Sequence, residues 1–253
     1  MRPRFRVCLL SLSILLGAED AHARLFRADN GDHRLVGIKL ELQAGRSHCA
    51  PATMAAALNY HGIATDQRAL TNAVGRTSET GTDVESMLEQ VTPLSAKHGL
   101  QVETLIGFDY ARYRHTILAY NRLARKAGRK RLWFMEQEPL DLAKTFARAD
   151  IDLLRQTFGR RERAAFRSFV RDTIDADAPL IWGVVLGIAH EPELPEQSRG
   201  GHLRLIIGYN AKTDEILYAD PWGPGHALKR MPQADALAIT MSLHRLKATQ
   251  DDH

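Results

Sequence analysis

The C-terminal part of the chain carries the clearest strand patterns. Residues 180–188 (LIWGVVLGI) form a continuous apolar run, which is typical of a strand that is covered on both faces. Residues 201–210 (GHLRLIIGYN) and 215–220 (EILYAD) follow, and the polar residues between them are turn formers. Two strands joined by a short polar turn predict an antiparallel hairpin.

The region around Cys49 combines a strand pattern with a helix pattern. Residues 37–42 (GIKLEL) alternate apolar and charged side chains, which predicts a short strand. Good helix formers follow Cys49, with Pro51 where a first helical turn tolerates proline and Gly62 as the stop. Cys49 is therefore expected at the start of a helix.

Helical patterns dominate the middle of the chain. Residues 82–91 place apolar side chains at near-helical spacing, and Pro93 is expected to end or kink that helix. After a predicted strand over residues 101–108, residues 109–178 predict two or three amphipathic helices. Helices that come before strands, rather than alternating with them, indicate an α+β fold instead of a parallel βαβ sheet.

Composition and charge are those of an ordinary globular protein. Of the 253 residues, 44% are hydrophobic and 25% charged, which argues against a disordered, collagen-like or disulfide-dense chain. The net charge of +4 is too small to imply nucleic acid as a partner. Eight Lys or Arg residues do cluster from Arg112 to Arg131. We interpret them as the solvated face of helices, with an acidic partner or a membrane surface as the alternative.

The N-terminus has the pattern of a cleaved secretory signal. Residues 1–6 carry three arginines and no acid, residues 7–18 are mostly apolar, and Ala21 and Ala23 form an A-x-A site. An apolar helix of that length rises only about 18 Å, less than the ~30 Å hydrocarbon core of a bilayer. We therefore expect removal of residues 1–23, no stable membrane span afterwards, and a domain over residues 24–253 that is periplasmic or secreted.

Signal removal would leave Cys49 as the sole cysteine, because Cys8 lies inside the signal. A single thiol cannot form an intramolecular disulfide, so Cys49 is either a buried structural residue or a reactive one. Its expected place at a helix start favours the reactive interpretation. The unpaired amides and dipole there stabilise a thiolate and lower the pKa of the thiol.

Three further polar residues could complete a site around this thiol. His202 follows two glycines and opens a predicted strand, and Asp220 ends the next strand, within reach of the imidazole. Gln43 stands six residues before Cys49, across a glycine-containing loop, from which its amide could donate to an oxyanion. A thiol, an imidazole and an orienting carboxylate are the groups that nucleophilic acyl transfer requires.

The motifs around these four residues resemble those of the papain-like cysteine peptidases. The closest likeness is to the C39-like branch, relatives of the domains that trim double-glycine leader peptides. The likeness is carried by Gln43 with five residues before Cys49, by CAPA at 49–52, by GHL at 201–203 running on to IIGYN, and by YADPWG at 218–223.

The resemblance implies a papain-like α+β fold in which a helical lobe carries the nucleophile and packs with an antiparallel sheet lobe. It also implies Cys49 as nucleophile, His202 as general base and acid, Asp220 as orienter and Gln43 as oxyanion donor, with no cofactor. Two features depart from the family: Ala50 stands where a glycine is often found, and residues 109–175 read as a helical insertion, which could form a lid or a substrate-docking lobe.

The expected function is that of an exported cysteine peptidase, which hydrolyses peptide or amide bonds of a peptide or protein substrate through a thioester. Double-glycine specificity is not carried over, because leader-trimming members are fused to membrane transporters. An amine or thiol acceptor at the same site would make a transamidase or acyltransferase, and a scaffold without turnover would be a peptide-binding module. No metal site is expected: His48 lacks a C-x-x-C or H-x-x-x-H partner, and the motif around Glu191 lacks a second histidine.

Overall fold

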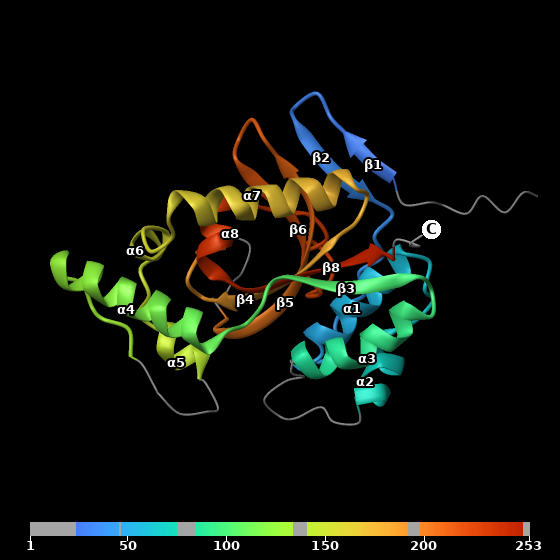
Figure 1. Ribbon diagram of the computed structural model, residues 1–253, viewed down its shortest axis with the longest axis horizontal. Helices are drawn as coiled ribbons and strands as arrows, with labels where there is room; N and C mark the ends of the chain where they lie inside the picture. Colours follow the sequence, from blue (N-terminus) through green and yellow to red (C-terminus); the bar gives the residue numbers. More distant parts are fainter. Residues whose placement is uncertain (1–23, 46, 75–83, 134–140, 192–197, 250–253) are drawn as a thin grey trace, which may run out of the picture.

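The computed structural model describes residues 24–45, 47–74, 84–133, 141–191 and 198–249 (Figure 1). The predicted signal, residues 1–23, lies outside the described residues. Within the described ranges, no helix has the length and apolar character needed to cross a bilayer.

One antiparallel sheet organises the described chain. Its main path runs through β1 (Arg24–Arg27), β2 (Asp32–Val36), β5 (Gly200–Asn210), β4 (Leu180–Leu186), β8 (Thr240–Ala248) and β3 (Leu100–Ile106). β6 (Glu215–Ala219) pairs with β5, and β7 (Lys229–Pro232) pairs with β6. Strand β5 therefore pairs with β2, β4 and β6, and forms the centre of the sheet.

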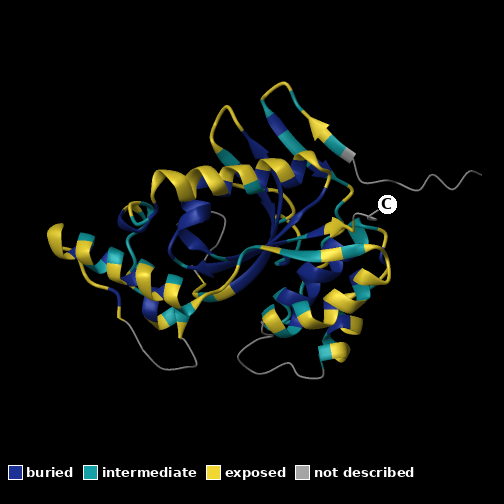
Figure 2. Ribbon diagram, in the orientation of Figure 1, coloured by how far each residue is buried: buried dark blue, intermediate teal, exposed yellow. Residues whose placement is uncertain are grey.

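Helices cover the two faces of this sheet. On one face lie α1 (Cys49–Tyr60), α2 (Gln67–Val74) and α3 (Val84–Ala96), which share a core with Ile181, Leu203 and Leu205. On the other face, around Trp182 and Ile206, pack α7 (Arg160–Asp175) and α8 (Gln233–Ile239). α4 (Tyr110–Lys126), α5 (Leu142–Phe146) and α6 (Ile151–Arg155) extend this second half of the molecule. Figure 2 shows the buried strands between helices whose outer faces are exposed.

The α+β architecture is confirmed, with a helical lobe that carries Cys49 against an antiparallel sheet that carries His202. All seven residues of β4 are buried, as its continuous apolar run predicts, and β5 and β6 form the predicted hairpin. The helix of Cys49 also forms as predicted and is followed by Gly62, whose φ of +79° lies in the left-handed region.

One expectation near the helical lobe needs correction. The prediction of a strand over residues 37–42 is wrong: the strand is β2 (Asp32–Val36), which pairs with β1 and β5, and residues 37–42 pair with no strand. Gly37 explains the difference, because its φ of +85° is incompatible with a continuing strand. Of the outcomes expected at Pro93, an end of the helix is not observed: α3 contains Pro93 and continues through it to Ala96.

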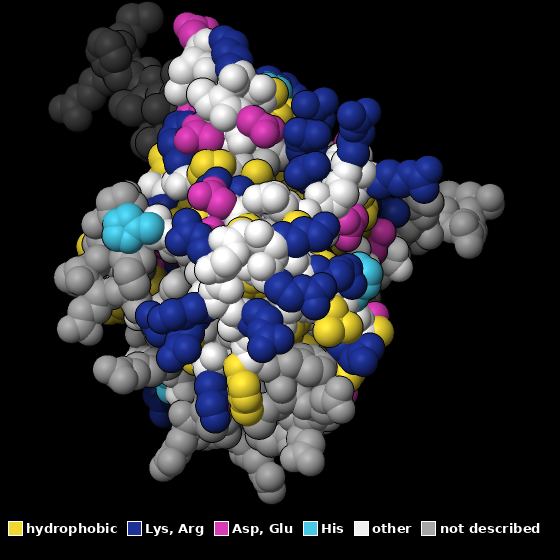
Figure 3. All heavy atoms as spheres, turned by 90° about the vertical axis from the view of Figure 1, so that its left-hand side faces the viewer, with side chains coloured by type: hydrophobic (Ala, Val, Ile, Leu, Met, Phe, Trp, Pro, Cys, Tyr) yellow, Lys and Arg dark blue, Asp and Glu magenta, His cyan; other side chains and the backbone are white. Residues whose placement is uncertain are grey.

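The described residues of segment 109–175 hold four helices, α4 to α7, rather than the two or three expected over residues 109–178. Ile117 of α4 and Phe166 of α7 belong to the same buried cluster as Trp182 of the sheet. In the structure this segment is thus part of the main core. Figure 3 shows that Lys and Arg side chains gather on the face formed by α4, α6 and α7, and those of the last turns of α4 are exposed.

Candidate active site

Cys49 is the first residue of α1, after His48 as the N-cap. The buried Thr53, one turn later, donates its hydroxyl to the carbonyl of Leu203 at 3.0 Å, which fixes the start of the helix against β5. Burial raises the pKa of the Cys49 thiol. The hydrogen bond and charge of His202, with the backbone amides of Leu203 and Ala50, outweigh burial and bring the pKa below its ordinary value.

His202 is the third residue of β5, and its buried imidazole lies between three partners. Nε2 is 2.9 Å from Oδ1 of Asp220. The ring stacks on the indole of Trp222, with centroids 4.6 Å apart and planes inclined by 26°. Because Nε2 contacts the carboxylate, Nδ1 is the ring nitrogen left for the hydrogen bond with Cys49.

The electrostatics favour a charged thiol–imidazole pair. Burial lowers the pKa of His202, but its hydrogen bonds and charge interactions with Asp220 and Cys49 raise it above the ordinary value. Burial raises the pKa of Asp220, but His202 and Arg204 bring it below the ordinary value. The thiol and the imidazole therefore shift in the directions that produce a thiolate and an imidazolium.

Gln43 is held at the edge of this site by its backbone. Its amide N–H donates to the carbonyl of Pro221 at 2.8 Å, which ties the loop before Cys49 to the residues that follow Asp220. Its side-chain Nε2 donates to the carbonyl of Gly45 at 2.7 Å, and Oε1 is buried without a partner among the described residues. The structure thus places His202 in contact with both Cys49 and Asp220, whereas the hydrogen bond of the Gln43 side chain stays within its own loop.

A buried ionic network behind Asp220 escaped the sequence analysis. Arg204 has no exposed side-chain surface; its Nε donates to Oδ2 of Asp220 at 2.5 Å and its Nη2 donates to Oε1 of Glu191 at 2.8 Å. Oε2 of Glu191 accepts from Lys229 Nζ at 2.6 Å and from the hydroxyl of Tyr218 at 2.8 Å. Each carboxylate therefore lies between cationic groups.

Strand alternation could have revealed Arg204. It stands two residues after His202 in a strand, so both side chains lie on one face, and an arginine within an apolar strand needs a buried acid. From the sequence, Glu191 belongs only to an incomplete metal-binding motif. Within the described ranges, no group of three or more His, Cys, Asp or Glu side chains could hold a metal ion.

A comparison of the sequence with models of known protein families finds a match. Residues 135–239 match the model of the Peptidase_C39 like family. The match covers less than half of the chain, and it shows that this segment is similar to that family. The matched segment contains His202, Arg204 and Asp220 but not Cys49 or Gln43, and it begins inside residues 109–175, the predicted insertion.

One solved structure with a detectable likeness is the peptidase domain of Streptococcus ComA, a bi-functional ABC transporter involved in a quorum sensing pathway. The two chains share 14% sequence identity, the alignment covers 83% of this chain and 96% of the ComA domain, and the TM-score is 0.43. No curated protein matches the chain.

Proposed function

We propose that this protein is a cysteine peptidase that cleaves peptide or amide bonds through a thioester on Cys49. The observation that carries the proposal is the hydrogen-bonded Cys49–His202 pair, with the pKa of the thiol lowered and that of the imidazole raised although burial opposes both shifts. Asp220, itself buried, fixes the ring from its other nitrogen.

In the proposed reaction the Cys49 thiolate attacks the substrate carbonyl carbon and an oxyanion forms. The protonated Nδ1 of His202 then gives its proton to the leaving nitrogen, the C–N bond breaks, and a thioester and a free amine result. His202 next takes a proton from water, which attacks the thioester. Loss of the thiolate yields the carboxylic product and restores the charged pair.

The backbone amide of Cys49 and the side chain of Gln43 are the proposed donors to the oxyanion. Nε2 of Gln43 carries two protons, and its bond to Gly45 uses one of them. The second proton is available for a substrate oxygen. Asp220 is the proposed orienting residue, which keeps Nδ1 facing the thiol.

Export through a cleaved signal, with a periplasmic or secreted mature chain, is part of the proposal and rests on the sequence of residues 1–23. N-terminal sequencing of protein recovered from outside the cytoplasm tests it. A new N-terminus at Arg24 is expected, and an intact Met1 in that fraction would contradict it.

Incubation of the protein with a mixed-peptide library, followed by mass spectrometry, tests the activity. New termini are expected with the wild type, none with Cys49→Ala, and an acyl-enzyme adduct on Cys49 after brief exposure. An added amine separates hydrolysis from acyl transfer, because a transamidase would yield amidated products. Tight peptide binding without cleavage or adduct would contradict the peptidase and favour a binding module.

A further inference from the structure

Six titratable side chains form a row in which each contacts the next and the charges alternate in sign. The row runs through Cys49, His202, Asp220, Arg204, Glu191 and Lys229. With a thiolate at one end and an imidazolium beside it, the signs are minus, plus, minus, plus, minus, plus. The proposed reaction uses the first three members of this row, and the last three have no assigned part in it.

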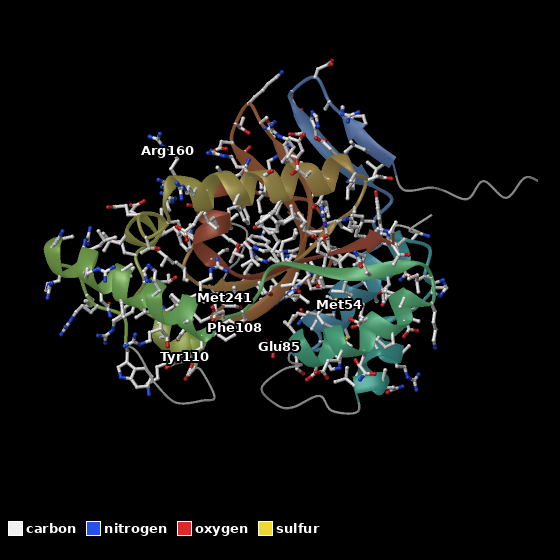
Figure 4. All side chains as sticks on the ribbon, in the orientation of Figure 1. Met54, Glu85, Phe108, Tyr110, Arg160 and Met241 are labelled. Carbon is white, nitrogen blue, oxygen red and sulfur yellow. The ribbon has the colours of Figure 1, made fainter. Side chains whose placement is uncertain are left out.

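Glu191 is the buried anion of this row that no proposed step uses. Its partners come from three strands: Arg204 of β5, Tyr218 of β6 and Lys229 of β7. Burial raises the pKa of Glu191, but the charge of Arg204 and the hydrogen bonds from Lys229 and Arg204 bring it below its ordinary value, so the side chain is anionic. Figure 4 shows Arg160, a cation of α7, projecting away from the ribbon, which is the usual place of a charged side chain.

Arg204 places a second cation beside the imidazole of His202. Both side chains donate to Asp220, and both contact the indole of Trp222. The His202 ring centroid is 4.6 Å from that of the indole, and the guanidinium carbon of Arg204 is 5.5 Å from the same ring. A like charge held so near disfavours the imidazolium, unless a negative charge balances it.

Glu191 is placed to supply that balance. Its Oε1 accepts from Nη2 of Arg204, on the nitrogen next to the one that remains, Nη1, which is buried without a partner among the described residues. The guanidinium is therefore held between two carboxylates, Asp220 on the side of the imidazole and Glu191 on the side of Lys229. A change of charge at Glu191 acts on His202 across this one side chain.

We propose that Glu191 is a positioning residue that acts on the Cys49–His202 pair through Arg204. Its negative charge balances Arg204, so that Arg204 can hold Asp220 in place without driving the proton from His202. The inference deepens the proposed function and rests on it, because it assigns the tuning of the proposed charged pair to a residue that touches neither Cys49 nor His202.

Variants of opposite charge change test the proposal. Glu191→Gln removes a negative charge, so thiolate formation at Cys49 and proton loss from His202 should both move to lower pH, by about 0.5–1 pH unit. Lys229→Met removes a positive charge and should move both to higher pH by a similar amount, because Arg204 still keeps Glu191 ionised. The double variant loses one charge of each sign and should return both midpoints toward those of the wild type.

Two titrations measure these midpoints without turnover. The rate of iodoacetamide alkylation against pH reports the thiolate of Cys49, and NMR of protein with labelled imidazoles reports the proton of His202. His226 titrates nearby, since its ring meets the indole of Trp222 edge-on at 5.9 Å, so His202→Ala and His226→Ala identify the two resonances.

Tyr218→Phe is the matched control, because it removes a hydrogen bond of 2.8 Å to Glu191 without a change of charge. It should lower the free energy of unfolding and leave both midpoints near those of the wild type. Unmoved midpoints in Glu191→Gln and Lys229→Met, or shifts of the same sign in both, would overturn the proposal and leave Glu191 a purely structural residue.

The wild-type protein separates the two proposals. Opposite shifts in the two variants, without any peptide cleavage by the wild type, would keep the assignment of Glu191 and reject the peptidase. Peptide cleavage by the wild type with unmoved midpoints in the variants would do the reverse.

Discussion

Arg204 and Asp220 form an ion pair in which neither side chain has any exposed surface, with Nε 2.5 Å from Oδ2. The other carboxylate oxygen, Oδ1, is 2.9 Å from Nε2 of His202 and also accepts the backbone amide of Trp222 at 3.2 Å. Both oxygens of Asp220 therefore have hydrogen-bond partners, and Arg204 fixes the orientation of the carboxylate toward the imidazole.

Replacement of Arg204 by methionine should be costly, because it leaves two buried carboxylates, Asp220 and Glu191, without a shared cation. Loss of one partner of a buried pair costs about 3–5 kcal/mol in free energy of unfolding. Arg167→Met is the matched control, since Arg167 pairs with Asp214 at the exposed surface and should change stability by less than about 1 kcal/mol. Urea unfolding measures both variants, and equal midpoints would show that the buried network does not stabilise the fold.

The pH dependence of Cys49 alkylation by iodoacetamide reports the charged pair. Alkylation requires the thiolate, and the lowered pKa of Cys49 moves the rise of the rate to lower pH than the ordinary ~8.5. We expect reaction to persist at about pH 5–6 in the wild type. In His202→Ala, burial is left to raise the pKa, so reaction should be lost in that range.

His190→Ala is the control for this measurement, because His190 is exposed and takes no part in the contacts among Cys49, His202 and Asp220. It should follow the wild-type curve. A curve that rises only near pH 8.5 in both the wild type and His202→Ala would reject the thiolate–imidazolium pair.

Gln43→Ala distinguishes oxyanion stabilisation from loop anchoring. Loss of one oxyanion donor should lower kcat by about 10²–10³-fold and leave iodoacetamide alkylation unchanged, since alkylation forms no oxyanion. Gln67→Ala removes a different anchor of the same loop, because Gln67 bonds Leu42 and Ala44 at 2.9 Å each. A similar loss of kcat in both variants would mean that Gln43 acts only by holding the loop.

Asp32→Asn should weaken the dependence of stability on acid. The hydrogen bond from Arg230 leads the groups that hold the pKa of Asp32 well below its usual range, with help from Asn210 and Asn30. The folded-state pKa is thus below the unfolded value of ~3.9, so the carboxylate stabilises the fold above that pH, and this contribution is lost as the pH falls. We expect Asp32→Asn to lower the free energy of unfolding by about 1–3 kcal/mol at pH 7 and by less at pH 3.

Asp29→Asn is the control, because Asp29 is an exposed neighbour, and it should change the free energy of unfolding little at either pH. Urea unfolding at both pH values measures the two variants.

Local sequence patterns predict the helices and strands whose signals lie within a few neighbouring residues. β4 is a single apolar run, and the helix of Cys49 has its stop signal in Gly62, so neither depends on distant sequence. Strand β8 was missed because polar side chains at Ser242 and His244 are buried in it and obscure the alternation. Ser242 fits there since Gly183, opposite it in β4, has no side chain.

The candidate site likewise contains residues that local patterns predict and residues that only the fold brings together. Cys49, His202 and Asp220 could be chosen because a helix start and a hairpin predict their neighbourhood. The Arg204–Glu191–Lys229 network joins residues from separate strands and a connecting segment, and only the folded chain brings them together. The backbone of Gln43 bonds Pro221 beside the site, but the bond of its side-chain amide to Gly45 depends on the exact path of the loop.

The position of strand β8 in the sheet determines when during folding the sheet can form completely. Residues 240–248 pair with β4 on one side and with β3 on the other, so Leu100 meets Ala248 across the ladder. Contacts between such distant parts of a chain form late and slowly in folding. During synthesis β3 and β4 would remain unjoined after Cys49 and His202 had both been made, and the sheet beneath the proposed site would close only with the arrival of β8. Chain topology would thus delay the assembly of the proposed site until residues 240–248 have been made.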